Sequence, residues 1–152
     1  MNLSGCTALK GLYCYDNQLT SLNANGCTAL TKLFCNENQL TGLDVSKNTA
    51  LTGLDCAGNQ LTSLSLSGCM ALKELKCGNN QLTSLDVSGC TSLTYLSCGE
   101  NKLMSLDVRK CPKLKTLYVN NSKLLENLYY NDNVKAVADG CDALSLPNSD
   151  EQ

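Results

Sequence analysis

Leucine recurs along this chain at intervals of 21 residues. Written in rows of that length, the sequence forms four columns that are almost entirely leucine. Their members are Leu9, Leu30, Leu51, Leu72, Leu93 and Leu114; Leu12, Leu33, Leu54, Leu75, Leu96 and Leu117; Leu19, Leu40, Leu61, Leu82, Leu103 and Leu124; and Leu22, Leu43, Leu64, Leu85 and Leu106. A fixed period of about 20 to 50 residues is typical of a solenoid, in which each coil buries its apolar side against its neighbours.

A shorter spacing of two within each coil predicts strands. A fifth apolar column, Ala24, Val45, Leu66, Val87 and Val108, follows the fourth leucine column at this spacing. Alternate side chains of a strand point to opposite faces, so each coil should hold two short extended segments, such as 12–14 and 22–24, joined by tight polar corners. No stretch between them is long enough for an ordinary helix. The pattern therefore predicts a mainly β solenoid with little helix.

The first half of each coil reads LKGLYCYDNQL, LTKLFCNENQL or a close variant, which is the pattern LxxLxCxxNxL. This pattern resembles the signature of leucine-rich repeat proteins, with cysteine at a place that leucine usually fills, and the match spans residues 3–124. The second half, for example TSLDVSGCTS, resembles the short 21-residue class found mainly in bacterial proteins. The resemblance implies a right-handed coil of about six repeats, with a parallel sheet on its concave face and short extended segments opposite. Such proteins mostly bind other macromolecules through the concave face.

An asparagine occupies the same corner of five successive coils, at Asn17, Asn38, Asn59, Asn80 and Asn101. Backbone N–H and C=O groups lose their ladder partners where the chain turns, and an inward amide can satisfy both kinds. We interpret the column as a structural asparagine ladder, because identical amides offer neither a nucleophile nor a base. Ser122 takes this place in the sixth coil, where the pattern weakens.

Ten of the 11 cysteines fall in two inward columns. These are Cys14, Cys35, Cys56, Cys77 and Cys98, continued by Val119; and Cys6, Cys27, Cys69, Cys90 and Cys111, interrupted by Asn48. Valine in place of cysteine indicates small apolar filling, which favours buried, reduced thiols. Disulfides remain the alternative, because coils about 4.8 Å apart lie within bridging range. Side chains that run side by side fit the disulfide dihedral poorly, and an odd count leaves at least one thiol unpaired, such as Cys141.

Composition and motifs exclude several classes of function. The chain has no histidine and no CxxC pair, which disfavours a zinc site, and we expect no metal and no cofactor. A net charge of −2 gives no basic footprint for nucleic acid, and no apolar run reaches the roughly 20 residues that membrane insertion needs. No catalytic motif is present, so we expect no enzyme. Localisation stays open between the cell surface or a secreted longer bacterial protein, and the cytoplasm.

The repeat boundaries suggest one domain over residues 1–152. Repeats are expected over 3–124, beginning in the middle of a coil without an N-terminal cap. Residues 125–146 are interpreted as a degenerate last repeat and C-terminal cap, and 147–152 as a flexible tail. An open solenoid end exposes apolar surface, so self-association through the N-terminal end, as a structural spacer or assembly unit, is an alternative function. An enzyme inhibitor of leucine-rich repeat type is a second alternative, based on the resemblance alone.

Partner-binding residues are expected at the outward positions of the first strand and just after it, because packing leaves these positions free to vary. The candidates are Tyr13, Tyr15, Phe34, Asp55, Glu74, Lys76, Tyr95 and Tyr118. Rigid aromatic rings bury area at low entropic cost, and neighbouring charges add complementarity. These residues predict a non-catalytic module that binds a protein. The alternative is that rings such as Tyr13 and Phe34 only stabilise the sheet by stacking across it.

The second extended segment carries a polar column, Asn23, Asp44, Ser65, Asp86 and Asp107. We interpret these residues as a solvated edge or as local caps on the backbone. Calcium binding is the minor alternative, because no second aspartate lies beside each one in the coil.

Overall fold

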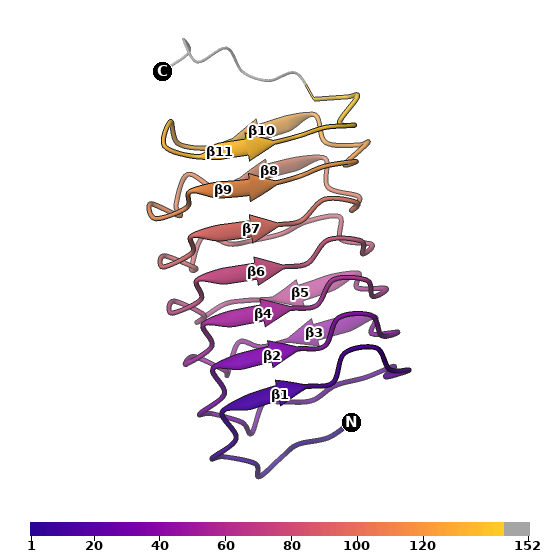
Figure 1. Ribbon diagram of the computed structural model, residues 1–152, viewed down its shortest axis with the longest axis vertical. Coiled ribbons are helices and arrows are strands. Elements are labelled where there is room, and N and C mark those ends of the chain that lie inside the picture. The colour runs from indigo at the N-terminus through magenta and orange to yellow at the C-terminus, as the bar shows by residue number, and fades with distance from the viewer. Residues whose placement is uncertain (145–152) are drawn as a thin grey trace.

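The computed structural model describes residues 1–144 of the chain, which form eleven three-residue strands and no helix (Figure 1). The strands are β1 (Gly11–Tyr13), β2 (Lys32–Phe34), β3 (Gly42–Asp44), β4 (Gly53–Asp55), β5 (Ser63–Ser65), β6 (Glu74–Lys76), β7 (Tyr95–Ser97), β8 (Ser105–Asp107), β9 (Thr116–Tyr118), β10 (Asn127–Tyr129) and β11 (Lys135–Val137). They stack along one axis as successive coils, which confirms the predicted β solenoid.

One strand from each coil joins a seven-stranded parallel sheet in the order β1-β2-β4-β6-β7-β9-β11. The register repeats the sequence period, since Leu33 lies opposite both Leu12 and Leu54. Each leucine points inward while the residues on either side point outward. We call the outward side of this sheet the sheet face.

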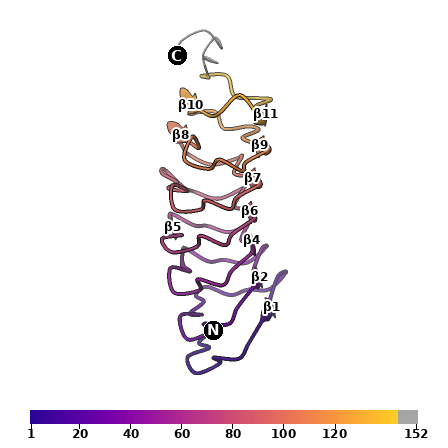
Figure 2. The same ribbon diagram turned by 90° about the vertical axis from the view of Figure 1, so that its left-hand side faces the viewer.

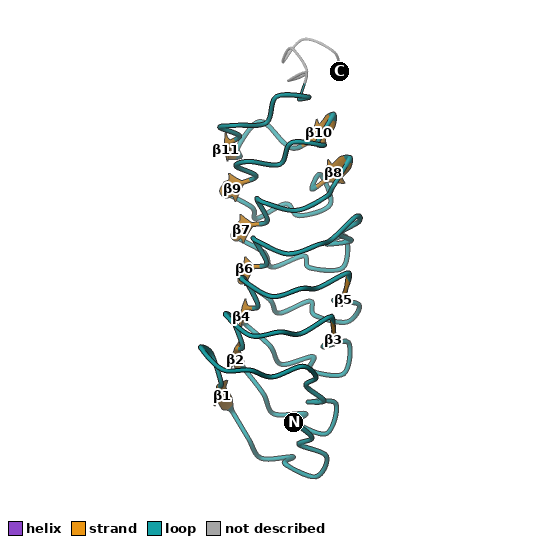
Figure 3. Ribbon diagram, turned by 90° about the vertical axis from the view of Figure 1, so that its right-hand side faces the viewer, coloured by secondary structure: helices purple, strands orange, loops and turns teal. Residues whose placement is uncertain are grey.

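The opposite side of the solenoid is less regular (Figures 2 and 3). Its strands form only two pairs, β3 with β5 and β8 with β10. The intervening coil at 84–86 belongs to no strand, and Asn2 and Asn23 form an isolated bridge. The predicted second extended segment therefore becomes paired sheet in some coils only. We call this side the second face.

The leucine columns fill the space between the two faces. Leu33, Leu54, Leu75 and Leu96 of the strand column are at most 1% exposed. The first-coil leucines Leu9, Leu12 and Leu19 are only partly buried, because a coil packs on one side of them and not on the other.

The prediction that Leu124 points inward is wrong: its side chain is 52% exposed, and Leu125 is fully buried instead. The cause is a change of corner. The amides of Ser122 and Leu125 donate to the carbonyls of Val119 and Ser122, as Cys27 and Leu30 do to Ala24 and Cys27 at the other corner of an earlier coil. This corner places β10 opposite β8 at a spacing of 22 residues. Ser122 therefore does not continue the asparagine column, and its hydroxyl is buried without a hydrogen-bond partner.

Strands β10 and β11 lie within residues 125–146, where we expect a last repeat and cap. The expected tail, 147–152, and the last two residues of that cap lie outside the described residues. The division of the chain at these boundaries stays a prediction.

Candidate functional site

The corner asparagines bind neighbouring coils to each other. Asn80 Nδ2 donates to the carbonyl of Cys77 in its own coil at 3.1 Å and to that of Cys56 in the preceding coil at 3.0 Å. Its Oδ1 accepts from the N–H of Leu61 at 2.9 Å. The same three kinds of bond recur at Asn38, Asn59 and Asn101. These bonds fix the corners that follow β2, β4, β6 and β7, and with them the outward side chains beside those corners.

The sheet face carries two aromatic pairs on adjacent strands. Tyr13 of β1 and Phe34 of β2 meet edge to face, with ring centroids 5.3 Å apart and planes at 84°. Tyr95 of β7 and Tyr118 of β9 form a tilted pair with centroids 5.7 Å apart. Tyr15, just after β1, is 49% exposed and belongs to neither pair. The structure thus brings four of the predicted aromatic residues together as two separate pairs.

Charged residues lie between the two pairs. Lys76 Nζ lies 3.1 Å from Glu74 Oε1 and 6.0 Å from the centroid of the Tyr95 ring. The hydrogen bond to Glu74 raises the pKa of Lys76. Asp55, on β4, accepts a hydrogen bond from the N–H of Ala57, but burial outweighs it and raises the pKa of this carboxyl group. Asp55 has no salt-bridge partner in the described part of the chain, so its charge is available to a partner.

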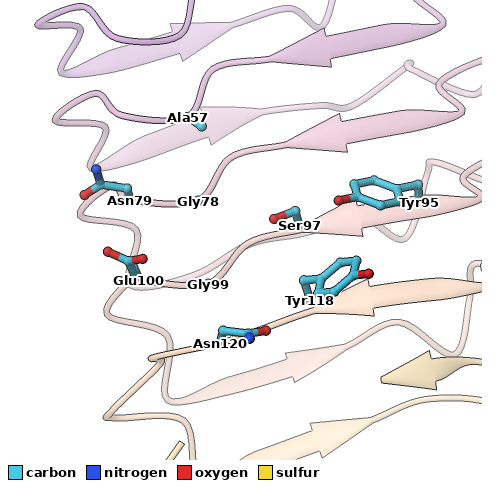
Figure 4. Close-up of a pocket in the computed structure, with 9 residues that line it drawn as sticks. All are labelled: Ala57, Gly78, Asn79, Tyr95, Ser97, Gly99, Glu100, Tyr118 and Asn120. Atoms are coloured by element: carbon cyan, nitrogen blue, oxygen red, sulfur yellow. The ribbon is translucent and has the colours of Figure 1, made fainter. Parts of the chain in front are cut away.

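A hollow of about 380 Å³ lies beside the tyrosine pair (Figure 4). We call it the tyrosine hollow; its lining consists of Ala57, Gly78, Asn79, Tyr95, Ser97, Gly99, Glu100, Tyr118 and Asn120. Figure 4 shows the two rings at one end, Asn79 and Glu100 at the other, and Gly78 and Gly99 between them. Apart from Tyr95 and Tyr118, these residues are not among the predicted site residues. The signal that could have revealed them is the loss of bulk in one column, where Tyr15 and Asn36 give way to Ala57, Gly78 and Gly99.

Gly99 is required by a close backbone contact. A Cβ atom at this position would lie 2.3 Å from the carbonyl oxygen and 2.9 Å from the amide nitrogen of Asn120. Backbone atoms cannot move aside as a flexible side chain can, so the floor of the hollow is fixed.

The cysteines are free thiols throughout, and nine of them are buried. The prediction of buried thiols is confirmed for these nine. Cys6 is exposed, contrary to its assignment to an inward column, because its corner has a neighbouring coil on one side only. Cys141 is partly buried.

The second cysteine column is more than apolar filling. Cys69 Sγ donates to the carbonyl of Val45 at 3.4 Å, and Cys111 Sγ donates to that of Val87 at 3.3 Å. Asn48 takes the same place in its coil, and its Nδ2 donates to the carbonyl of Ala24 at 2.9 Å. A donor toward the preceding coil is thus the property that Asn48 shares with Cys27, Cys69 and Cys111 of this column.

A thiol reagent should separate the exposed cysteine from the buried ones. We expect iodoacetamide at pH 8 to modify Cys6 rapidly, because thiolate formation and access both control the reaction. The nine buried thiols should react only after unfolding. Mass spectrometry of peptides from native and denatured samples measures the reaction at each site. Modification of Cys56 or Cys77 in the native protein as fast as that of Cys6 would contradict the packing described here.

The polar column of the second face caps the local backbone. The Oδ1 atoms of Asp44, Asp86 and Asp107 accept from the amides of Ser46, Ser88 and Arg109 at 2.9 to 3.0 Å. Hydrogen bonds from the side chains of Ser46, Ser88 and Arg109 are the largest cause of the lowered pKa of the three aspartates. The predicted capping role is confirmed. Residues 1–144 contain no helix that is long and apolar enough to span a membrane.

Comparisons with known proteins describe the repeat and the fold. A family profile described as Leucine Rich repeats (2 copies) matches residues 49–89. An internalin (inlF) from Listeria monocytogenes is 23% identical over 88% of this chain and 48% of its own, with a TM-score of 0.73. The leucine-rich repeat protein LIC12759 from Leptospira interrogans is 23% identical over 89% of this chain and 41% of its own, with a TM-score of 0.68. These two structures share the solenoid fold.

A further solved structure is the functional domain of InlJ from Listeria monocytogenes, which is described as including a cysteine ladder. It is 25% identical over 97% of this chain and 48% of its own, with a TM-score of 0.43. The chain spans about half the length, or less, of the solved structures it matches. No curated protein matches it significantly.

Proposed function

Because this chain is a leucine-rich repeat protein, we propose that it binds a protein partner through the sheet face. Leucine-rich repeats are in general protein–protein interaction modules and are typically not catalytic. The observation that carries the proposal is the presence of two aromatic pairs, Tyr13 with Phe34 and Tyr95 with Tyr118, on one face of one sheet. Tyr13 is 60% exposed, so much of its ring is open to a partner.

The spacing of the pairs defines the partner's surface. Phe34 and Tyr95 are separated by the strands β4 and β6, so their strands lie three spacings, or about 14 Å, apart. Aromatic anchors in contact with pockets on a partner supply much of the binding energy of an interface. The charged residues between the pairs, Asp55, Glu74 and Lys76, would select the partner and speed its association.

We further propose that the chain does not catalyse a reaction. It has no histidine, which is the most common general base in enzymes. Its net charge of −2 also favours a protein partner over nucleic acid.

Replacement of the four anchors tests the binding proposal. We expect the variant Tyr13→Ser, Phe34→Ser, Tyr95→Ser and Tyr118→Ser to lose partner binding by at least about 100-fold, because each anchor contributes about 1 to 2 kcal/mol or more. The wild type and the variant are used to capture partners from lysates and a cell-surface fraction, and the recovered partner is then titrated by calorimetry. Loss of sheet stacking should lower the melting temperature only slightly.

A matched variant on the second face provides the control. Met70→Ser, Met104→Ser and Tyr129→Ser replace large exposed side chains without touching the sheet face, and this variant should retain the partner. Equal binding by the wild type and the anchor variant would refute the proposal and favour a spacer or assembly role. A large loss of stability with binding intact would show that the aromatic pairs serve the sheet alone.

A further inference from the structure

The tyrosine hollow exists because small residues replace larger ones beneath it. Tyr15 and Asn36 occupy the column in the first two coils, and Gly78 and Gly99 occupy it in later coils. Beside these small residues, the Tyr95 and Tyr118 pair borders a hollow of about 380 Å³. This space is large enough for one long side chain of a partner.

The groups around the hollow accept hydrogen bonds and cations. Glu100 is the charged residue of its lining, and it lies opposite the two rings (Figure 4). Asn120 Oδ1 is buried and accepts no hydrogen bond in the described structure. The faces of tyrosine rings attract cations, and Lys76 already holds its ammonium group 6.0 Å from the Tyr95 centroid. A ligand with several N–H donors and a positive charge fits this set of groups.

The local charge favours the same ligand. Strands β4, β6 and β7 and the corners that follow them carry three carboxylates and one ammonium group, from Asp55, Glu74, Glu100 and Lys76. Lys76 is neutralised by Glu74 at 3.1 Å. Glu100, which lines the hollow, has no salt bridge in the described residues, so it would repel an acidic side chain and attract a basic one.

Glu100 occupies a backbone conformation that does not suit glutamate. Its φ of 54° lies in the left-handed region, as do those of Asn79 at 51° and Asn121 at 57° in the neighbouring coils. Asparagine and glycine adopt this region more readily than glutamate. Glu37 adopts the same region at a φ of 52° in the second coil, so asparagine should fit the backbone at either position.

We propose that the tyrosine hollow binds an arginine side chain of the protein partner. This inference rests on the proposed function of the sheet face. The planar guanidinium group stacks on one of the two rings, because Tyr95 and Tyr118 are tilted at 47° to each other, and it donates to the Glu100 carboxylate. Arginine fits better than lysine, because its five donors have fixed directions and its plane matches an aromatic face.

A short peptide tests the hollow without the partner. The probe is acetyl-Gly-Arg-Gly-amide, and its isosteric control carries neutral citrulline in place of arginine. We expect the arginine peptide to shift the NMR amide signals of Gly78 and Gly99 with a dissociation constant in the millimolar range. The citrulline peptide should bind about tenfold more weakly, because it lacks the charge that strengthens these hydrogen bonds. Equal affinity for both peptides, or shifts confined to other residues, would overturn the proposal.

Two matched variants separate charge from structure. Glu100→Asn should lower the affinity for the arginine peptide about tenfold. Its melting temperature should equal or exceed that of the wild type, because asparagine tolerates the positive φ. Glu37→Asn makes the same change at a φ of 52° beside the other aromatic pair, and should leave peptide affinity within twofold. An unchanged affinity in Glu100→Asn would refute the role of the hollow.

The outcomes distinguish this inference from the proposed function. If the anchor variant loses the partner but Glu100→Asn retains full affinity for it, the sheet face binds and the arginine site is wrong. If the anchor variant retains the partner, and the arginine peptide shifts the NMR signals of Gly78 and Gly99 in the wild type, the proposed function is wrong and the hollow is a separate site.

Discussion

A reduced sample of this protein is expected to unfold cooperatively when the pH is raised from 8 to about 10.5. The responsible groups are the buried thiols of the two cysteine columns. Burial raises the pKa of Cys35, Cys90 and Cys98 to about 12 and that of Cys111 to about 11. It raises the pKa of Cys56 and Cys77 well above the ordinary value as well.

The direction follows from proton binding. In the unfolded chain the thiols ionise near pH 8.5, whereas in the folded chain they stay protonated up to pH 11 or 12. Above pH 8.5 the unfolded chain therefore binds fewer protons, and the free energy of unfolding falls as pH rises. At pH 10 each strongly shifted thiol removes roughly 2 kcal/mol, at about 1.4 kcal/mol per pH unit. Three such thiols remove roughly 6 kcal/mol, which is comparable with the whole stability of an ordinary domain.

Circular dichroism against pH, in the presence of a phosphine reductant, measures this transition. The matched control is the variant Cys35→Val, Cys77→Val and Cys98→Val, since Val119 already continues this column within the core. Its unfolding midpoint should move to higher pH because three ionisable groups are absent. A midpoint identical to that of the wild type would show that the thiols do not govern alkaline unfolding.

Replacement of Asn80 by alanine is expected to cost about 2 to 4 kcal/mol of stability. The substitution removes the bonds to the carbonyls of Cys56 and Cys77 and leaves the buried N–H of Leu61 without an acceptor. The two carbonyls keep one bond each, from Asn59 and Asn101. The unpaired amide and the lost bonds between coils therefore account for most of the effect.

Asn17→Ala is the matched comparison for this prediction. Asn17 is exposed, and its Nδ2 donates to the carbonyls of Cys14 and Tyr15 without linking two coils. We expect this substitution to cost less than about 1 kcal/mol. Urea unfolding of both variants gives the comparison, and similar losses at the two positions would contradict an inter-coil role for the buried amide.

The fold was predictable because each coil buries the same positions. Counting in steps of 21 places Leu75 and Cys77 in the core, and both are fully buried. The count fails at Leu124, since the corner from Val119 to Leu125 belongs to the other corner type and shifts the inward position by one residue. Counting in steps of 21 assumes that the same kind of corner occurs at the same place in every coil. It cannot anticipate a coil in which one kind of corner replaces the other.

The candidate site was less accessible to sequence reasoning. Outward positions such as Tyr95 and Tyr118 follow from strand alternation, but their mutual approach and the adjoining hollow depend on what the neighbouring residues lack. Gly78 and Gly99 contribute by having no side chain, and the loss of bulk in their column does not by itself indicate a hollow. Their effect becomes visible only once the coils are stacked.

The uneven pairing of the two faces gives the solenoid different stiffness on its two sides. The sheet face has one ladder of backbone bonds through seven strands, while the second face is interrupted at 84–86. Tension along the axis should therefore be carried by the sheet, and bending should open the coils on the opposite side. The distance between the two aromatic pairs would then stay constant when the solenoid is pulled along its axis, and a partner bound to both pairs would stay bound.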